Sequence, residues 1–528
     1  MVARPAFARS TIGVAAALVA LLLAVAPRYG PHRDELYFVA AGRRLAWGYP
    51  DQPPLTPAIA SLVDTVAPGS LVGLRSVSAA AMALVVVLAA LCARELGGAA
   101  PAQRLAAIVT ATSVLTMAIG HLLSTATFDT LAWAVVLWLV LRTLVRDEPR
   151  TWLAVGVAAG VALENKTLVL GLLVALVVGV GLTPAVRHHL RSPWAWAGAL
   201  IALLLWVPNL VWQAGAGWPQ LALAGDIQDE YGALGERIAY VGLQLAQVSP
   251  LAAPLWIFGI VRLLRDDRWR AARPIAWSYV VLALALLVVG GKAYYLGGLM
   301  PVLLAAGSVA LVERWSERRI TVAAVALALT AAVAWPIGLP LLPASWWASS
   351  PYAVASDDQT NTIGWPAVVA SIREAVDGSD AEVVLTWNYG EAGAAEWYGV
   401  DVPVFSGHNG FGRWGPPPEG AGPVVVVGFD DTSGLLEGLP RGRPRGSRFR
   451  HRQRGAGRER AGVHRAGRRV GIGVATRSAP LGLTLPRLLA AARPARTMPW
   501  CPAGVAQLAA HPTCNREVRG SIPLAGSM

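Results

Sequence analysis

Residues 28–60, RYGPHRDELYFVAAGRRLAWGYPDQPPLTPAIA, are the stretch from which the fold and function of the chain are inferred. This segment follows an apolar stretch, yet it contains acids, bases, aromatic rings and a pair of adjacent prolines. Its charged and titratable side chains include His32, Arg33, Asp34, Glu35, Arg43, Arg44 and Asp51. Such an interruption in a very hydrophobic chain raises the question of what these side chains do together.

The composition indicates a polytopic membrane protein. Of the 528 residues, 55% are hydrophobic and 15% are charged, whereas soluble domains usually contain about 25% charged residues. Repeated apolar stretches of about 18–20 residues predict transmembrane helices. We therefore expect an all-α membrane domain over residues 1–340 with about 11 spans. The apolar stretches are 10–27, 72–92, 105–120, 128–145, 152–164, 167–183, 196–212, 240–261, 275–291, 294–311 and 320–338.

The arginine distribution predicts the topology of these spans. If the N terminus is cytoplasmic, alternate loops are rich in arginine and the loops between them are not, as the positive-inside rule requires. Only residues 28–60 break this pattern on the outer side. We expect a plasma-membrane location. Two points stay open: the first stretch could be a signal peptide, and the short stretches 152–164 and 167–183 could form one long helix.

The composition changes after the last apolar stretch. The sequences EVVLT (382–386) and VVVVGF (424–429) predict buried strands, and WPAVVASIREAV (365–376) predicts an amphipathic helix. The sequence NYGEAGAAEWYG (388–399) is typical of a strand end that leads into a helix. We therefore expect a small extracytoplasmic α/β domain over residues 341–440, truncated if the reading frame is lost after it.

The tail explains the basic character of the chain. The net charge is +13, and residues 441–528 hold 18 arginines and two glutamates. The basicity therefore belongs to the tail and does not indicate a nucleic-acid partner for the rest of the protein. The segment GVAQLAAHPTCNREVRGSIPLAGS (504–527) resembles the conceptual translation of a tRNA gene. Two interpretations remain, a frameshift with read-through into a tRNA gene and a genuine basic tail.

Two lysines stand out against 43 arginines. Lys166, in LENKTLVL, and Lys292, in GGKAYYLGGLMP, both lie where an apolar stretch meets an outer loop. A lysine at membrane depth is costly and is therefore a functional candidate. The structural alternative is a side chain that reaches the interface from a helix end.

Three acids are predicted near the same face of the membrane. Asp34 and Glu35 follow the first span, and Asp129 begins the fourth. On a helix, Asp34 and Glu35 point about 100° apart and can face different partners. The alternatives are helix capping for Asp129 and solvated loop charges for Asp34 and Glu35. By the predicted topology, these acids and both lysines lie on one side.

Carboxylates and cations at a lipid–water interface suit one kind of chemistry. A lipid-linked phosphate needs a basic counter-charge, aromatic rings and prolines can line a groove for an isoprenoid tail, and a carboxylate can deprotonate an incoming hydroxyl. Candidate groove residues are Tyr37, Trp47, Tyr49, Pro53, Pro54, Tyr294 and Tyr295.

The first outer loop resembles that of the GT-C membrane glycosyltransferases of family 39, the group that includes protein O-mannosyltransferases and the aminoarabinose transferase of lipid A. The matching elements are Asp34-Glu35, Gly48-Tyr49 and Pro53-Pro54-Leu55. Gln52 stands where the family frequently has histidine, and Lys166 matches the family's Leu-Thr-Lys element. The segments WVPNLVWQAGAGWP (206–219), GKAYYLGGLMPVLL (291–304) and SGHNGFGRWGPPP (406–418) are also similar, the last to actinobacterial members.

The resemblance implies an inverting transfer of a sugar, mannose or arabinose-like, from a polyprenyl-phosphate donor to an extracytoplasmic acceptor. Asp34 would be the general base, Glu35 would orient the loop or the acceptor, and Asp129 would be a second acid. The cations available to the donor phosphate are Arg43, Arg44, Lys166 and Lys292. The sequence has no dedicated metal-ligand spacing, so a divalent cation near Asp34 stays open. Two other classes remain, a lipid or sugar transporter or flippase and a non-catalytic scaffold for envelope assembly.

Overall fold

The computed structural model describes residues 4–379, 381–418, 421–428 and 472–475. Six helical segments in these ranges are long and apolar enough to cross a membrane, and the bent pair α5–α6 raises the number to seven. The six are α4 (Leu71–Glu95), α7 (Thr125–Arg146), α10 (Pro193–Ala216), Asp267–Val289 with α14 (Arg273–Val289), Ala293–Val312 with α15 (Met300–Val312), and Glu317–Ile337 with α16 (Glu317–Ala334).

The predicted apolar stretches are largely helical, but 105–120 and 240–261, each predicted as one span, are divided between two helices. The shorter or broken ones are α1 (Ser10–Val25), α5 (Ala100–Thr112), α6 (Val114–His121), α8 (Trp152–Leu163), α9 (Val169–Gly181), α12 (Leu234–Ala246) and α13 (Ala253–Arg265). The stretches 152–164 and 167–183 form two helices in contact, α8 and α9, and not one long helix. The number of 11 spans stays a prediction, because length and composition alone support six or seven.

The bend between α5 and α6 measures 58° and falls within an apolar stretch. A break leaves backbone groups without helical partners, and such groups are costly inside a bilayer. Here Val114 N–H donates to the carbonyl of Val248 (2.9 Å), and Leu115 N–H donates to that of Gln247 (3.0 Å). Carbonyl groups from a segment more than a hundred residues later in the chain therefore accept the hydrogen bonds of backbone N–H groups at the break.

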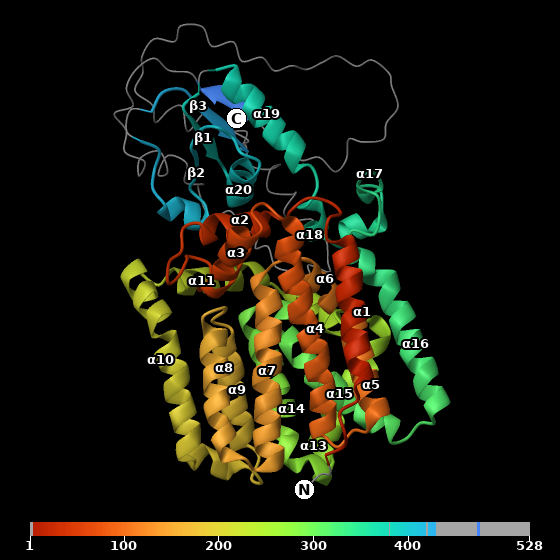
Figure 1. The fold of residues 1–528 in the computed structure, drawn as a ribbon. Coiled ribbons are helices and arrows are strands. Elements are labelled where there is room, and N and C mark those ends of the chain that lie inside the picture. The colour runs from red at the N-terminus through yellow and green to blue at the C-terminus, as the bar shows by residue number, and fades with distance from the viewer. Residues whose placement is uncertain (1–3, 380, 419–420, 429–471, 476–528) are drawn as a thin grey trace, which may run out of the picture.

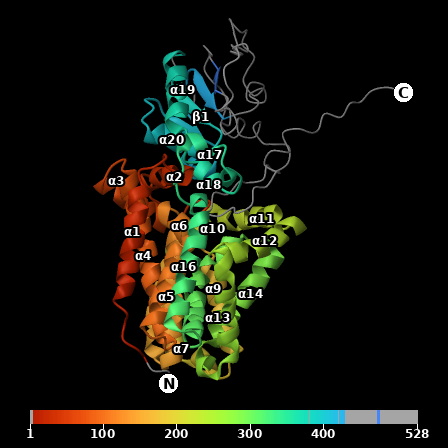
Figure 2. The same ribbon diagram turned by 90° about the vertical axis from the view of Figure 1, so that its right-hand side faces the viewer.

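The arginine-rich loops gather at one end of the bundle, which we call the far end. Arg4 contacts Glu95 (2.7 Å), and Arg268 contacts Glu313 (2.9 Å). The N-terminal end of the chain lies at this end in both views (Figures 1 and 2). The predicted alternation of loops is therefore consistent with the fold, and the assignment of this end to the cytoplasm stays a prediction.

The opposite end, which we call the sheet end, carries short helices and a sheet (Figure 1). Helices α2 (Arg33–Gly42), α3 (Leu55–Val66) and α11 (Pro219–Tyr231) lie there. The small helices α17 (Ala344–Trp347) and α18 (Asp357–Thr360) lie at the same end. Residues 28–60 therefore do not span the membrane. They form a layer between the bundle and the sheet.

The sheet has four strands in the order β2-β1-β3-β4. Strand β1 pairs in parallel with β2 and β3, and β3 pairs antiparallel with β4. The helices α19 (Trp365–Asp377) and α20 (Tyr389–Trp397) coincide with the predicted helices, and β1 and β3 with the predicted strands. The strands are β1 (Val383–Thr386), β2 (Val404–Ser406), β3 (Val424–Val427) and β4 (Ile472–Ala475).

Apart from β4, the predicted tail 441–528 lies outside the described residues. The boundaries of the predicted domains, 1–340, 341–440 and 441–528, stay predictions. Isoleucine and valine side chains of α19, β1 and β3 form the core of the sheet region, with Ile372, Val384 and Val425 fully buried.

Candidate functional site

The site begins at the first turn of α2, whose start is fixed by a capping box. His32 Nδ1 accepts a hydrogen bond from Asp34 N–H (3.2 Å), and the Glu35 carboxylate accepts one from His32 N–H (2.8 Å). Carboxylates in the first turn of a helix are favoured by its dipole. The sequence therefore folds locally so that two adjacent acids leave the helix in different directions, as predicted.

Glu35 faces the bundle and is completely buried. Arg75 of α4 donates to both of its oxygens, from Nε to Oε1 (3.2 Å) and from Nη2 to Oε2 (2.9 Å). Leu123 N–H donates to Oε1 as well (3.0 Å). A buried charge is tolerated when it is paired and hydrogen-bonded, as this carboxylate is. The same hydrogen bonds connect the start of α2 to α4 and to the loop after α6.

Asp34 faces the sheet and is 8% exposed. Tyr389 Oη, from α20, donates to Asp34 Oδ1 (2.7 Å), and His32 Nδ1 lies 3.9 Å from Oδ2. Burial raises the pKa of Asp34 to about 6, although the Arg33 charge and the Tyr389 hydrogen bond lower it. A carboxylate with such a pKa is ionised at neutral pH and yet is basic enough to accept a proton.

A second acid, Asp51, belongs to the same site and was not among the predicted site residues. Tyr37 Oη donates to Asp51 Oδ1 (2.8 Å) and accepts from Gly410 N–H (3.1 Å). Burial raises the pKa of Asp51 to about 6, and its charge in turn raises the pKa of Asp34. The only sequence signal was its position beside the Gln52–Pro53–Pro54 element of the first loop.

Lys166 and Asp129 meet at the sheet end, as the topology predicts. Lys166 Nζ lies 3.9 Å from Asp129 Oδ2, 4.7 Å from the ring centre of Tyr295 and 5.1 Å from that of Tyr294. The loop that carries Lys166 is tied to α3, because Thr56 Oγ1 donates to Asn165 Oδ1 (2.7 Å). The predicted cation, acid and tyrosines therefore form one cluster.

Lys292 lies at the same end of the bundle and is 6% exposed. Its Nζ is 5.2 Å from the ring centre of Tyr231 on α11. Its charge lowers the pKa of Asp34. The structure therefore brings Asp34, Asp129 and both lysines to the sheet end, from four separate segments of the chain.

Arg43 and Arg44 occupy different surroundings from those of the lysines. Arg43 Nε donates to Asp64 Oδ2 (3.0 Å) at the surface. Arg44 makes two hydrogen bonds with the carboxylate of Glu396 (2.7 and 3.1 Å), and its guanidinium lies 4.6 Å from the ring centre of Trp414. Each arginine thus already has a carboxylate partner, and Arg44 joins α2 to the sheet region.

The predicted groove residues of the first loop divide by burial. Trp47 is 63% exposed, whereas Tyr49 is 1% exposed and donates its hydroxyl to the carbonyl of Ala41 (2.9 Å). Pro53 is buried and Pro54 half-buried, before the start of α3. Trp47 is therefore the aromatic side chain of this loop that presents a large apolar surface.

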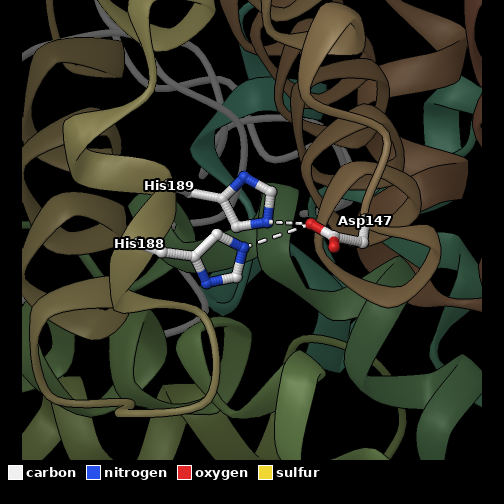
Figure 3. Close-up of side chains that lie close together, drawn as sticks. All are labelled: Asp147, His188 and His189. Atoms are coloured by element: carbon white, nitrogen blue, oxygen red, sulfur yellow. Dashed lines mark hydrogen bonds and ion pairs between the residues drawn. The ribbon is translucent and has the colours of Figure 1, made fainter.

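Within the described residues, one group of three side chains could hold a metal ion, and it lies far from Asp34, beside the far end of α7. Asp147 Oδ1 is 3.2 Å from His188 Nε2 and 3.3 Å from His189 Nε2 (Figure 3). The indole N–H of Trp152 donates to His189 Nδ1 (3.2 Å). A neutral His189 therefore carries its proton on Nε2, where it faces Asp147 and blocks that nitrogen as a ligand.

Comparisons with known proteins agree with this architecture. Residues 51–212 match the sequence profile of the family described as dolichyl-phosphate-mannose-protein mannosyltransferase. The structure is similar to that of ArnT from Cupriavidus metallidurans in the apo state, with a TM-score of 0.59 and 15% identity over 81% of this chain and 94% of that chain. ArnT bound to undecaprenyl phosphate gives a TM-score of 0.54 at the same identity and coverage. No curated protein matches the chain in sequence.

The helix bundle and its likeness to ArnT define a multi-pass membrane protein with the GT-C fold. Within that class, the profile match confirms the predicted resemblance to family 39 over residues 51–212. At 15% identity the structural likeness shows the fold alone.

Proposed function

We propose that this protein is an integral membrane glycosyltransferase. It moves a sugar, mannose or arabinose-like, from a polyprenyl-phosphate donor to an extracytoplasmic acceptor, a protein, a glycan or a lipid. The observation that carries the proposal is the buried and hydrogen-bonded Asp34 at the end of the bundle that also holds Lys166 and Lys292. ArnT, whose fold the chain shares, is a protein seen with undecaprenyl phosphate bound.

In this mechanism the acceptor hydroxyl loses its proton to Asp34 as its oxygen attacks the anomeric carbon of the donor sugar. The bond between that carbon and the phosphate oxygen breaks, and the electron pair stays on the polyprenyl phosphate. A single displacement of this kind inverts the anomeric configuration. The attacking oxygen approaches from the face opposite to the leaving phosphate.

The proposed role of the lysines is to stabilise the phosphate as it leaves the sugar. A leaving phosphate gains negative charge, and cations placed where charge develops stabilise it. Lys166 stands beside two tyrosine rings and Asp129, and Lys292 is buried beside Tyr231. We assign these two residues, before Arg43 and Arg44, to the donor phosphate, because both lysines lie among aromatic rings at the end of the bundle that holds Asp34, whereas the Arg43 and Arg44 side chains are 44% and 38% exposed.

The remaining acids have supporting roles in this proposal. Glu35 positions the first turn of α2, and Asp129 holds Lys166. We assign no metal-dependent step, because within the described residues no group of three ligating side chains converges on Asp34. A divalent cation near Asp34 therefore stays an open prediction.

The decisive experiment compares Asp34→Asn with Asp64→Asn in membranes supplied with a polyprenyl-phosphate sugar. Asp64 is a matched control, because it is an aspartate on the neighbouring helix α3 that pairs with Arg43 at the surface. We expect Asp34→Asn to lower the transfer rate by about 10²–10⁴-fold, the usual contribution of a general base, and Asp64→Asn to leave it unchanged.

Transfer by Asp34→Asn at the wild-type rate would show that the base is misassigned. If the wild-type protein moves the donor lipid across vesicles and no glycosidic bond forms, a transporter or flippase is the correct class. Radiolabelled donor and chromatography of the products distinguish these outcomes.

A further inference from the structure

The contact between α20 and α2 is unusually close, and two glycines make it possible. A Cβ atom on Gly390 would lie 2.8 Å from Cβ of Arg33, and one on Gly393 would lie 2.9 Å from Cβ of Leu36. Real Cβ atoms do not approach neighbours so closely. The glycines therefore let the sheet region rest directly on the helix that carries Asp34 (Figures 1 and 2).

Tyr389, the first residue of α20, uses this contact to reach Asp34. The preceding residue, Asn388, caps α20 by accepting from Gly390 N–H (2.8 Å), which fixes where the helix begins. The Tyr389 ring is 4% exposed and lies 5.2 Å from the ring of Tyr37 and 5.0 Å from that of His408. The ring is thus held from several sides, and its hydroxyl points at Asp34 Oδ1 (2.7 Å).

We infer that Tyr389 is a positioning residue for the catalytic carboxylate, so that the sheet region completes an active site otherwise built from the layer of residues 28–60 and the sheet end of the helix bundle. This inference rests on the proposed function of Asp34. A hydrogen bond from Tyr389 to Oδ1 fixes the carboxylate rotamer, with Oδ2 3.9 Å from His32 Nδ1. The two residues are 355 positions apart in the chain.

The hydrogen bond also stabilises the ionised form of Asp34. The groups that act on Asp34 are His32 and Arg33 on its own segment, Asp51 in the loop after α2, Lys292 beside α15, and Tyr389 on α20. Tyr389 lowers the pKa of Asp34 against the effect of burial. Removal of the hydroxyl should therefore raise that pKa. The acid limb of the pH profile, the range in which the transfer rate falls as the pH decreases, should then move to higher pH.

The test is Tyr389→Phe, with Tyr398→Phe as the control. Tyr398 lies at the other end of α20 and is half-buried, so the control removes the same hydroxyl from the same region. We expect Tyr389→Phe to lower the plateau rate at least tenfold and to move the acid limb upward by about one pH unit, the size of a single pKa perturbation. Tyr398→Phe should change neither.

A second variant distinguishes an effect on Asp34 from a loss of folded protein. Gly393→Ala keeps every polar group but pushes α20 away from Leu36, and it should move the acid limb in the same direction. The position of the limb does not depend on how much folded protein is present. In the Asp34→Asn background, Tyr389→Phe should cause no further loss of rate.

An unchanged acid limb in Tyr389→Phe, with Asp34→Asn inactive, would overturn the inference and leave the proposed function intact. An Asp34→Asn variant that retains full activity would instead overturn the proposed function. The two failures are therefore distinguishable in one set of membranes.

Discussion

Histidine and aspartate side chains lie together at both ends of the bundle, but the two ends differ in how deeply the aspartate is buried. At the sheet end, Asp34 is 8% exposed and makes its hydrogen bond with a buried tyrosine. At the far end, the Asp147 side chain is 72% exposed and contacts the exposed His188 and the buried His189. The comparison teaches that proximity alone does not make a site, because burial is what shifts a pKa and strengthens an interaction.

The largest expected effect concerns the buried pair beneath Asp34. Glu35→Gln leaves the Arg75 charge buried without its partner, and breaking such a pair costs about 3–5 kcal/mol of unfolding free energy. The matched control is Asp64→Asn, whose partner Arg43 lies at the surface, where a pair contributes about 0–1 kcal/mol. Thermal unfolding of the purified protein in detergent measures both. Equal changes would show that the Glu35–Arg75 contact is not an anchor.

The next effect concerns the donor phosphate. Lys166→Met removes a cation at the sheet end and should raise KM for the donor by at least about tenfold, since hydrogen bonds to charged groups contribute about 1.5–3 kcal/mol. Arg43→Gln, which removes a surface cation already paired with Asp64, should leave KM unchanged. Initial rates at varied donor concentration test this. A rise in KM for Arg43→Gln alone would reverse the assignment.

A smaller effect is a shift in pH dependence. The base must be deprotonated, so the wild-type transfer rate should fall below about pH 6, where burial places the pKa of Asp34. Asp51 raises that pKa, so Asp51→Asn should move the acid limb to lower pH, the direction opposite to that of Tyr389→Phe. Rate profiles from pH 4.5 to 8, a range set by reference carboxyl and histidine pKa values, check the sign. A shift to higher pH would contradict the geometry.

The smallest effect is expected at the far end. Asp147→Asn removes an exposed carboxylate from the contacts with His188 and His189, and exposed ion pairs contribute about 0–1 kcal/mol. Transfer rate, with and without added Zn²⁺, should therefore be unchanged. A metal-dependent rate that disappears in this variant would show that the far end takes part in function.

The sequence predicted the helices well because each apolar stretch carries its own signal. It also predicted that Asp129 and Lys166 share one end of the bundle, since alternation of spans is enough to place them there, and they lie 3.9 Å apart. The number of spans was harder, because short helices such as α8 and α9 and the broken pair α5–α6 satisfy hydropathy without satisfying length.

Pairings between distant residues could not be predicted. Arg75 looks like an arginine at a helix start, and only the fold shows that it holds Glu35, 40 residues earlier. Arg44 looks like a phosphate ligand until Glu396, 352 residues later, comes to lie beside it. Tyr389 carries no motif that points to Asp34. These contacts depend on how the sheet region rests on α2, which no local pattern encodes.

The break between α5 and α6 imposes an order on the assembly of the protein. Val114 and Leu115 obtain their hydrogen-bond acceptors from residues 247 and 248, so the break stays unsatisfied until the ribosome has made that later segment. Leu123, in the loop after α6, donates a hydrogen bond to Glu35. Tyr389, which donates to Asp34, is synthesised later still. Asp34, the proposed base, is therefore among the first residues to be synthesised, and the tyrosine that donates a hydrogen bond to it follows 355 residues later.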